Sequence, residues 1–323
     1  METRVSIDSQ DIHRYPDTEA LAFVDEILGA PEAWSPSLIA YRLSSDFQAN
    51  WKIEVGHWLL FARDAGFLER LRKRIIDRAL GEAASPSVTG ANDSAHRTLL
   101  SELASVMVAH YFTRLGWRFQ SWEPPRPIPK GDIDLRLESP SGLVVDVQVK
   151  APDQPGEFSN GRIVNGEIDE RVLKAMNKAV GQLKFASGPG RMVVVCPQRT
   201  WPIEADVLAC YLLGKPTTRS EEVWGICREG GGVFSKPPGS EIAAVVALSY
   251  DCGLDKSLSP KALYRCIAIR NPWAPAAAAI PAACFPHARV LSLIGDRFVW
   301  EPEEPGKCFR FRTGTPLLQE GTG

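Results

Sequence analysis

Two neighbouring segments of this chain alternate between apolar and polar residues, and this pattern constrains the fold more than any other feature. Residues 132–138 read DIDLRLE and residues 142–150 read GLVVDVQVK, joined through the turn-forming sequence SPSG. Successive side chains of a β-strand point to opposite faces of the sheet. Alternation of this length around a turn therefore predicts a β-hairpin with one apolar face and one polar face.

The surrounding segments predict an α/β domain. Residues 96–116 and 169–186 carry apolar side chains at helical spacing, and RMVVVCP (191–197) is a continuous apolar strand, typical of a strand covered on both faces. Further strands are expected at EIAAVVALS (241–249) and ALYRCIAIR (262–270). This order of elements favours a mixed sheet flanked by helices.

The N-terminal part of the chain predicts a separate helical unit over residues 1–81. It contains amphipathic segments such as DTEALAFVDEILG and WSPSLIAYRL, the latter with Ser35 as the expected cap and Pro36 at the first helical position. Residues 82–95 are small and polar, which predicts a linker, and residues 96–323 then form the α/β domain. A chain of 323 residues has room for about two such units.

The polar face of the hairpin collects oxygen ligands next to an ammonium group. A site of this kind suits a divalent cation, because Mg²⁺ takes one or two carboxylates and keeps several waters. A bound metal lowers the pKa of water and neutralises phosphate oxygens, as phosphodiester hydrolysis requires. Lys150 would position the attacking water, help to deprotonate it, or stabilise developing negative charge. The residues on this face are Asp132, Asp134, Arg136, Asp146, Gln148 and Lys150.

A fourth acidic group lies on the preceding helix. Glu102 shares a helix face with Leu99 and Val106, which are three and four residues away. A buried and unpaired carboxylate is costly, and a shared metal site would satisfy it. The alternative is a surface residue paired with Arg97 or His96.

The order of these residues resembles the PD-(D/E)XK nuclease superfamily, in which a helix with Glu precedes a strand with Asp and a strand with (Asp/Glu/Gln)-x-Lys. GDIDL followed by VDVQVK matches this order, and the similarity covers about residues 95–197. The resemblance implies a restriction-endonuclease-like fold and Mg²⁺ or Mn²⁺ as the cofactor. It also implies Glu102, Asp134 and Gln148 as metal ligands, with Lys150 as the catalytic lysine.

Gln148 departs from the commoner acidic residue, and this QxK variant resembles Mrr-type restriction enzymes, which cut modified DNA. A glutamine ligand adds no negative charge, so metal binding should be weaker unless Asp132 or Asp146 compensates. The resemblance also places Lys178 and Gln182, in KAVGQLK, on a helix near the site and facing the phosphate backbone.

The charge balance does not single out a nucleic-acid-binding protein. The chain has 37 Lys and Arg against 39 Asp and Glu, a net charge of −2, whereas proteins that bind nucleic acid often carry a basic surplus. One basic helical segment, FLERLRKRIIDRAL, offers a phosphate-contacting surface, with an ordinary solvated face as the equally weighted alternative. Its candidate contact residues are Arg70, Arg72, Lys73 and Arg74.

The sequence therefore predicts a metal-dependent nuclease that hydrolyses phosphodiester bonds in DNA, of a restriction, defence or repair type. Nucleic acid is the expected partner, with a homodimer as a further expectation. The N-terminus lacks a secretory segment and no apolar run is long enough to span a membrane, so a cytoplasmic location is expected. Two alternatives stay open: an inactive nuclease-fold protein that binds nucleic acid or a partner protein, and a nucleotide-sugar transferase that uses DID to bind metal. The second lacks a Rossmann-like nucleotide motif.

Overall fold

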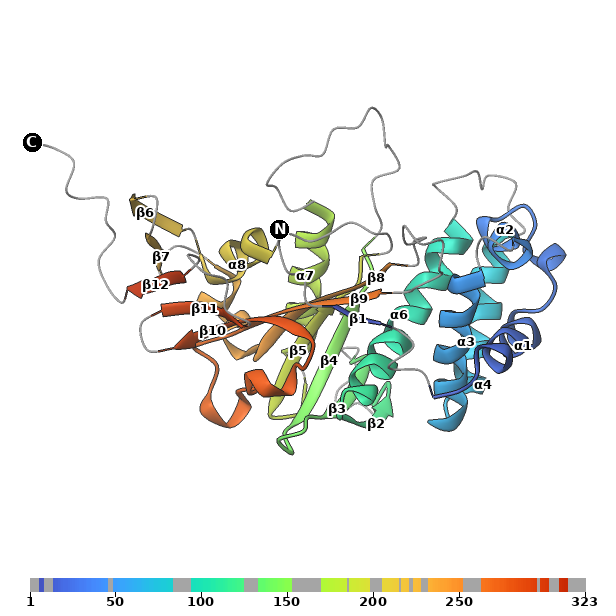
Figure 1. The fold of residues 1–323 in the computed structure, drawn as a ribbon, viewed down its shortest axis with the longest axis horizontal. Helices are drawn as coiled ribbons and strands as arrows, with labels where there is room; N and C mark the ends of the chain where they lie inside the picture. Colours follow the sequence, from blue (N-terminus) through green and yellow to red (C-terminus); the bar gives the residue numbers. More distant parts are fainter. Residues whose placement is uncertain are drawn as a thin grey trace, which may run out of the picture.

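The computed structural model shows an α/β protein in which helices cover both faces of one mixed β-sheet (Figure 1). We describe only the residues whose placement is defined. These are residues 6–8, 14–45, 49–83, 94–124, 133–152, 170–184, 186–197, 205–214, 216–220, 223–227, 232–251, 263–294, 297–301 and 308–312.

The predicted hairpin, formed by β3 and β4, lies near one edge of the sheet. Its strand order is β2-β3-β4-β5-β8-β9-β10-β11-β12-β7-β6, and β1 pairs with β9 off this path. The β2, β3 and β4 strands are antiparallel neighbours, whereas β5 runs parallel to both β4 and β8. The strands are β1 (Ser6–Asp8), β2 (Arg118–Trp122), β3 (Leu135–Glu138), β4 (Val144–Lys150), β5 (Gly190–Val195), β6 (Pro216–Ser220), β7 (Val223–Cys227), β8 (Ala244–Asp251), β9 (Leu263–Arg270), β10 (Ala288–Ile294), β11 (Arg297–Glu301) and β12 (Cys308–Arg312).

Helices lie on the two faces of this sheet. The N-terminal helices and α6 lie on one side, and α7 with α8 lies on the other (Figure 1). The α-helices are α1 (Asp17–Leu28), α2 (Leu38–Ser44), α3 (Ala49–Asp64), α4 (Leu68–Arg74), α5 (Gly81–Ala83), α6 (Ser94–Arg114), α7 (Glu170–Leu183) and α8 (Ala205–Leu213). A π-helical turn, η4 (Ile75–Leu80), continues α4, and 3-10 turns are η2 (Pro31–Trp34), η7 (Val233–Ser235), η8 (Gly239–Glu241), η9 (Ala276–Ala278) and η10 (Ala282–Cys284).

The apolar strand β5 shows why two layers of helices are needed. Met192 and Val194 belong to the apolar core beneath α6, whereas Val193 and Val195 belong to the core beneath α7 and α8. Because side chains alternate along a strand, a continuous apolar run can be buried only where both faces are covered. The predicted α/β class and the central position of this strand are confirmed.

The N-terminal helices share an apolar core with the sheet. Apolar side chains of α1 and α3, such as Val24 and Leu59, share one core with α6 and with β4. Part of the predicted linker 82–95 is helical at its ends, and its residues 84–93 lie outside the described part of the chain. The N-terminal helices therefore form a layer over the sheet.

One local expectation was wrong, and one strand was not predicted. Ser35 does not cap the second helix; it follows η2, and α2 begins after Ser37, whose Oγ accepts a hydrogen bond from the Ile39 N–H at 2.9 Å. An Ncap side chain must reach an N–H two or three residues ahead, and Ser37 meets this condition. The β2 strand, between α6 and β3, was not predicted, and its pairing with β3 shifts register between Phe119 and Ser121.

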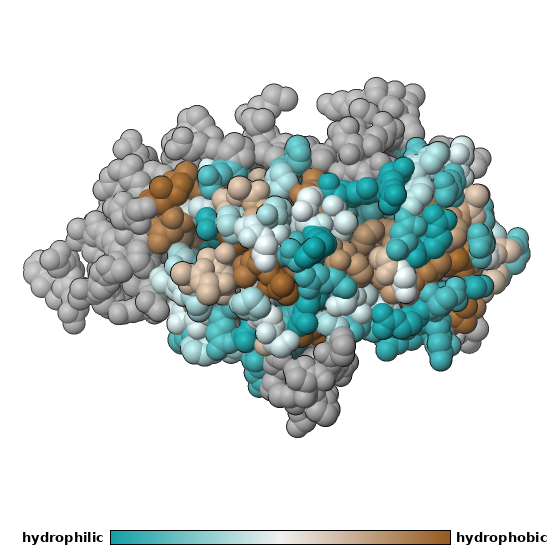
Figure 2. Space-filling model, turned by 90° about the horizontal axis from the view of Figure 1, so that it is seen from below, coloured by the Kyte–Doolittle hydropathy of each residue, from teal (hydrophilic) through white to brown (hydrophobic). Residues whose placement is uncertain are grey.

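The outer surface is mixed in character. On the face seen in Figure 2, apolar residues form separate patches among hydrophilic ones. The large apolar side chains exposed among the described residues are Tyr41, Ile76 and Ile294, which belong to three different elements. No described helix has the length and apolar character of a membrane span.

Candidate functional site

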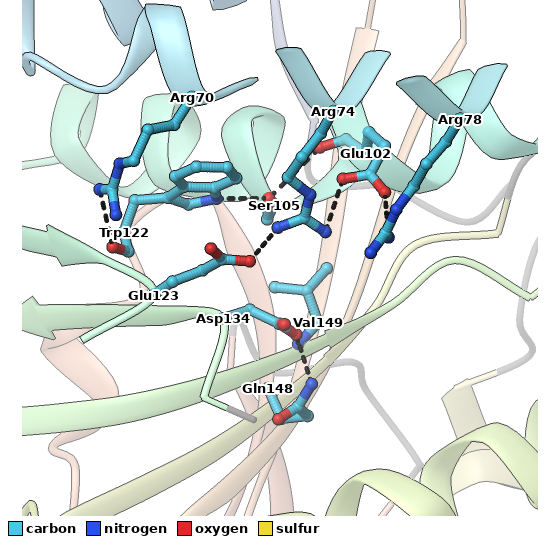
Figure 3. A network of polar contacts seen from close by, with 10 residues as sticks. All are labelled: Arg70, Arg74, Arg78, Glu102, Ser105, Trp122, Glu123, Asp134, Gln148 and Val149. Atoms are coloured by element: carbon cyan, nitrogen blue, oxygen red, sulfur yellow. Dashed lines mark hydrogen bonds and ion pairs between the residues drawn. The ribbon is translucent and has the colours of Figure 1, made fainter. Parts of the chain in front are cut away.

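The hairpin brings two of the predicted site residues into direct contact. Arg136 on β3 pairs with Asp146 on β4, and the antiparallel register continues to place Asp134 beside Gln148. The Gln148 Nε2 donates a hydrogen bond to Asp134 Oδ2 at 2.5 Å, and the Val149 backbone N–H donates to the same oxygen at 2.7 Å (Figure 3). The β4 strand therefore fixes the orientation of the Asp134 carboxylate.

Asp146 lies on the same face of the hairpin but in a different environment. Its carboxylate accepts hydrogen bonds from Arg136 Nε at 2.6 Å and Arg136 Nη2 at 3.0 Å, and from the Gly188 backbone N–H at 2.7 Å. The bond to Asp146 raises the pKa of the Arg136 guanidinium. The side chain of Asp146 is fully buried. This arrangement does not support the expected accessory role of Asp146 at a metal, and the other accessory carboxylate, Asp132, lies outside the described residues.

Glu102 is buried, as its position on the helix predicts, but its partner is not the one expected. Its side chain is 6% exposed and forms ion pairs with two arginines of the N-terminal layer. Arg74 Nη2 lies 2.7 Å from Oε2, and Arg78 Nη1 lies 2.8 Å from Oε1. The buried charge is thus compensated by arginines, and its burial does not require a metal ion.

A pocket joins these residues into one site. It has a volume of about 370 Å³ and lies between α6, α7 and the ends of β2 and β4. Of the predicted residues, Glu102, Asp134, Lys150 and Lys178 line it, together with Arg74 from the candidate contact set. Gln148 lies behind Asp134, and Gln182 is not part of the lining although it belongs to the same helix as Lys178.

The four candidate contact residues of the basic helix α4 fall into two groups, one in contact with β2 and one exposed to solvent. The guanidinium groups of Arg70 and Arg74 both lie over the Trp122 ring, 5.2 Å and 5.1 Å from its centre. Arg70 also donates to the Trp122 carbonyl oxygen at 3.3 Å (Figure 3). Arg72 and Lys73 are exposed to solvent. Two of the four candidate nucleic-acid contacts therefore connect the helical layer to β2.

Three residues of the site were missed from the sequence: Arg78, Trp122 and Glu123. Arg70, Arg74 and Arg78 recur every four residues, and this spacing, which places side chains on one face of a helix, was the available signal. Glu123 had no such signal. It lies in the pocket wall, forms an ion pair with Arg74, and has a φ of 49°, a left-handed conformation that is uncommon for a residue with a side chain.

Asp134 and Gln148 supply the oxygen atoms of the site that are available to a cation. In the part of the chain that is described, no group of three or more His, Cys, Asp or Glu side chains is arranged to hold a metal ion. However, Gln148 is 1% exposed and its Oε1 atom has no hydrogen-bond partner among the residues described, which is costly for a buried amide oxygen. Asp134 and this oxygen are one carboxylate and one neutral ligand, and Mg²⁺ accepts so few protein ligands when waters and a phosphate complete its shell.

Searches against protein-family models, curated proteins and solved structures gave no match to this chain.

Proposed function

We propose that this protein is a metal-dependent nuclease that hydrolyses phosphodiester bonds, with DNA as its substrate. The observation that carries the proposal is the contact between Asp134 and Gln148 beside a pocket that Lys150 also lines. These three residues occupy the positions that the resemblance to the PD-(D/E)XK superfamily assigns to the metal site and the catalytic lysine.

The order of elements around the site supports the same proposal. A helix (α6), three antiparallel strands (β2, β3 and β4), a second helix (α7) and a parallel strand (β5) follow one another along the chain. This is the arrangement expected for a restriction-endonuclease-like core. The helices before it and the strands after β5 then form additions to that core.

The residues of the site can be given distinct tasks. Asp134, held by the Val149 N–H, would hold the cation. Rotation of the Gln148 amide would exchange its hydrogen bond to Asp134 for a contact in which Oε1 serves as the second protein ligand. The metal would lower the pKa of a bound water and neutralise phosphate charge. The Lys150 ammonium group would stabilise the negative charge that develops on the phosphate oxygens.

Plasmid cleavage tests this proposal. The wild-type protein should cut plasmid DNA in the presence of Mg²⁺ and should not cut it in EDTA. Lys150→Ala and Asp134→Asn should each slow cleavage by about 100-fold or more, the scale expected when a charged group at the reacting phosphate is removed. Lys184→Ala is the matched control, because Lys184 is exposed and lies outside the pocket lining.

One observation favours a second candidate function, binding of nucleic acid without cleavage. Gln148 brings no charge to the site and Glu102 is neutralised by arginines, so the site holds less negative charge to bind a cation. Equal cleavage rates for the wild type and Lys150→Ala would refute the proposed mechanism. Binding of DNA with no cleavage under any divalent cation would favour the second function.

A further inference from the structure

We propose that the N-terminal helices contribute an arginine pair to the pocket, in which Arg78 binds phosphate, Arg74 anchors the pair, and Glu102 is the positioning residue that orients both. This inference rests on the proposed function. It assigns to the N-terminal layer the task of holding the nucleic-acid backbone beside Lys150.

Glu102 holds the guanidinium groups of Arg74 and Arg78 in place. The two arginines are four residues apart and approach the same carboxylate, one at each oxygen, at 2.7 and 2.8 Å. Because Glu102 is 6% exposed and belongs to the long buried helix α6, it is a fixed point for both guanidinium groups (Figure 3). The arginines are therefore held in place before a ligand arrives, which lowers the entropy lost on binding.

The two arginines differ in their ion pairs and in their exposure. Arg74 is balanced by Glu102 and by Glu123, whereas the ion pair of Arg78 is with Glu102 alone among the described contacts. A guanidinium group has five N–H donors in a planar fork that matches phosphate oxygens, and the contact to Glu102 uses one of them. The Arg78 side chain is also 59% exposed, against 30% for Arg74. Arg78 is thus the member that contacts phosphate, and Arg74 anchors the pair.

The charged residues around Arg78 determine on which side of it a phosphate lies. Lys150 and Lys178 line the same pocket as Arg78. With Arg74, the four basic side chains of this lining outnumber its three acidic ones, Glu102, Glu123 and Asp134. A neighbouring hollow of about 580 Å³ also borders Arg78, but Asp77 and Glu82 line it. A nucleic-acid backbone is repelled from the acidic hollow and drawn towards the two lysines, so Arg78 marks the limit of the phosphate path.

The test is a binding measurement that does not depend on cleavage. The fluorescence anisotropy of labelled single-stranded and duplex oligonucleotides is measured in EDTA with the full-length protein. Arg78→Ala should weaken binding about tenfold and should reduce the slope of log K against log salt by about 0.7–0.9, the contribution of one phosphate contact. Arg118→Ala is the matched control: it removes the same charge from an arginine that is 71% exposed and lies outside the pocket lining, and it should change affinity less than twofold.

Glu102→Gln separates positioning from simple electrostatics. Removal of a negative charge beside the arginines should strengthen binding of a polyanion if charge alone matters. If Glu102 orients the pair, the variant should instead bind more weakly than the wild type, with the melting temperature recorded to exclude unfolding. If Arg78→Ala melts at a lower temperature than the wild type, binding is measured with Arg78→Lys instead. This variant keeps the charge but loses the planar fork, so it should still bind more weakly than the wild type.

The outcomes distinguish this inference from the proposed function. Equal affinity of Arg78→Ala and Arg118→Ala for both oligonucleotides overturns the inference, as does absence of wild-type binding at low salt. Binding that depends on Arg78, together with no cleavage in Mg²⁺, supports the inference and refutes the nuclease. A preference for the single strand or the duplex shows which form of the backbone the arginine pair holds.

Discussion

At the scale of single residues, the two buried carboxylates nearest the site are both paired with arginine. Asp146 is bound by Arg136 in a two-point contact, and Glu102 is bound by Arg74 and Arg78. Removal of one partner from such a pair costs more than the pair contributes, because the other charge is left uncompensated. These contacts therefore predict stability effects that are separate from catalysis.

Asp146→Asn should lower the free energy of unfolding by about 2–4 kcal/mol, because it removes the charge that binds the partly buried Arg136. Urea denaturation measures the change. Glu241→Gln is the control, since Glu241 pairs with Arg191 but is half exposed, and a surface pair contributes less than about 1 kcal/mol. An Asp146→Asn variant as stable as the wild type would show that the ion pair is not structural.

A second prediction at this scale concerns thiol chemistry. Burial raises the pKa of the Cys266 thiol to about 12 and that of Cys196 further still. The thiolate is the reactive form, and at pH 8 about one Cys266 side chain in ten thousand is ionised. In the native protein, iodoacetamide should leave both residues unmodified while it alkylates the half-buried Cys210. Peptide mass spectrometry measures this, and equal modification of all three before denaturation would contradict it.

At the scale of elements, apolar patterning predicted the hairpin and the central strand but not the long-range contacts of the site. The β3, β4 and β5 strands alternate or are apolar throughout, and each was found in place. The β2 strand, RFQSW, was missed because its residues are mostly polar and its pairing is irregular. The partners of Glu102 lie 24 and 28 residues away in another helix, and local spacing carries no information about such a contact.

The packing of α1 against α3 gives a prediction for Gly56. A Cβ atom at this position would lie 2.2 Å from the backbone oxygen of Ala20, so the two helices would have to separate. Gly56→Ala should destabilise the protein by about 1–3 kcal/mol through overpacking. Gly181→Ala is the control, since Gly181 lies within α7 with open space around it and should gain about 0.5–1 kcal/mol from helix propensity. Thermal or urea unfolding measures both, and the opposite order of stabilities would contradict the close approach.

At the scale of the whole molecule, the N-terminal helices and the sheet form a single packing unit. A hydrogen-bond network connects them: the Trp58 Nε1–H donates to the Tyr264 hydroxyl at 2.8 Å, and that hydroxyl donates to Glu54 Oε2 at 2.7 Å. Trp58 and Glu54 belong to α3, whereas Tyr264 belongs to β9. Since the arginine pair also comes from this layer, the same packing that stabilises the fold completes the pocket.

This connection predicts that the parts of the chain on either side of the predicted linker, residues 82–95, do not fold separately. A fragment of residues 94–323 should be insoluble, or soluble without a cooperative unfolding transition, because it exposes the apolar residues of α6 that the helices cover. Co-expression of residues 1–83 should restore a soluble complex, which controls for damage caused by truncation alone. The measurements are sedimentation of the lysate and thermal unfolding followed by circular dichroism. A fragment 94–323 that unfolds cooperatively at the temperature of the full chain would show instead that the sheet has a sufficient core of its own, and that the helical layer is an independent attachment.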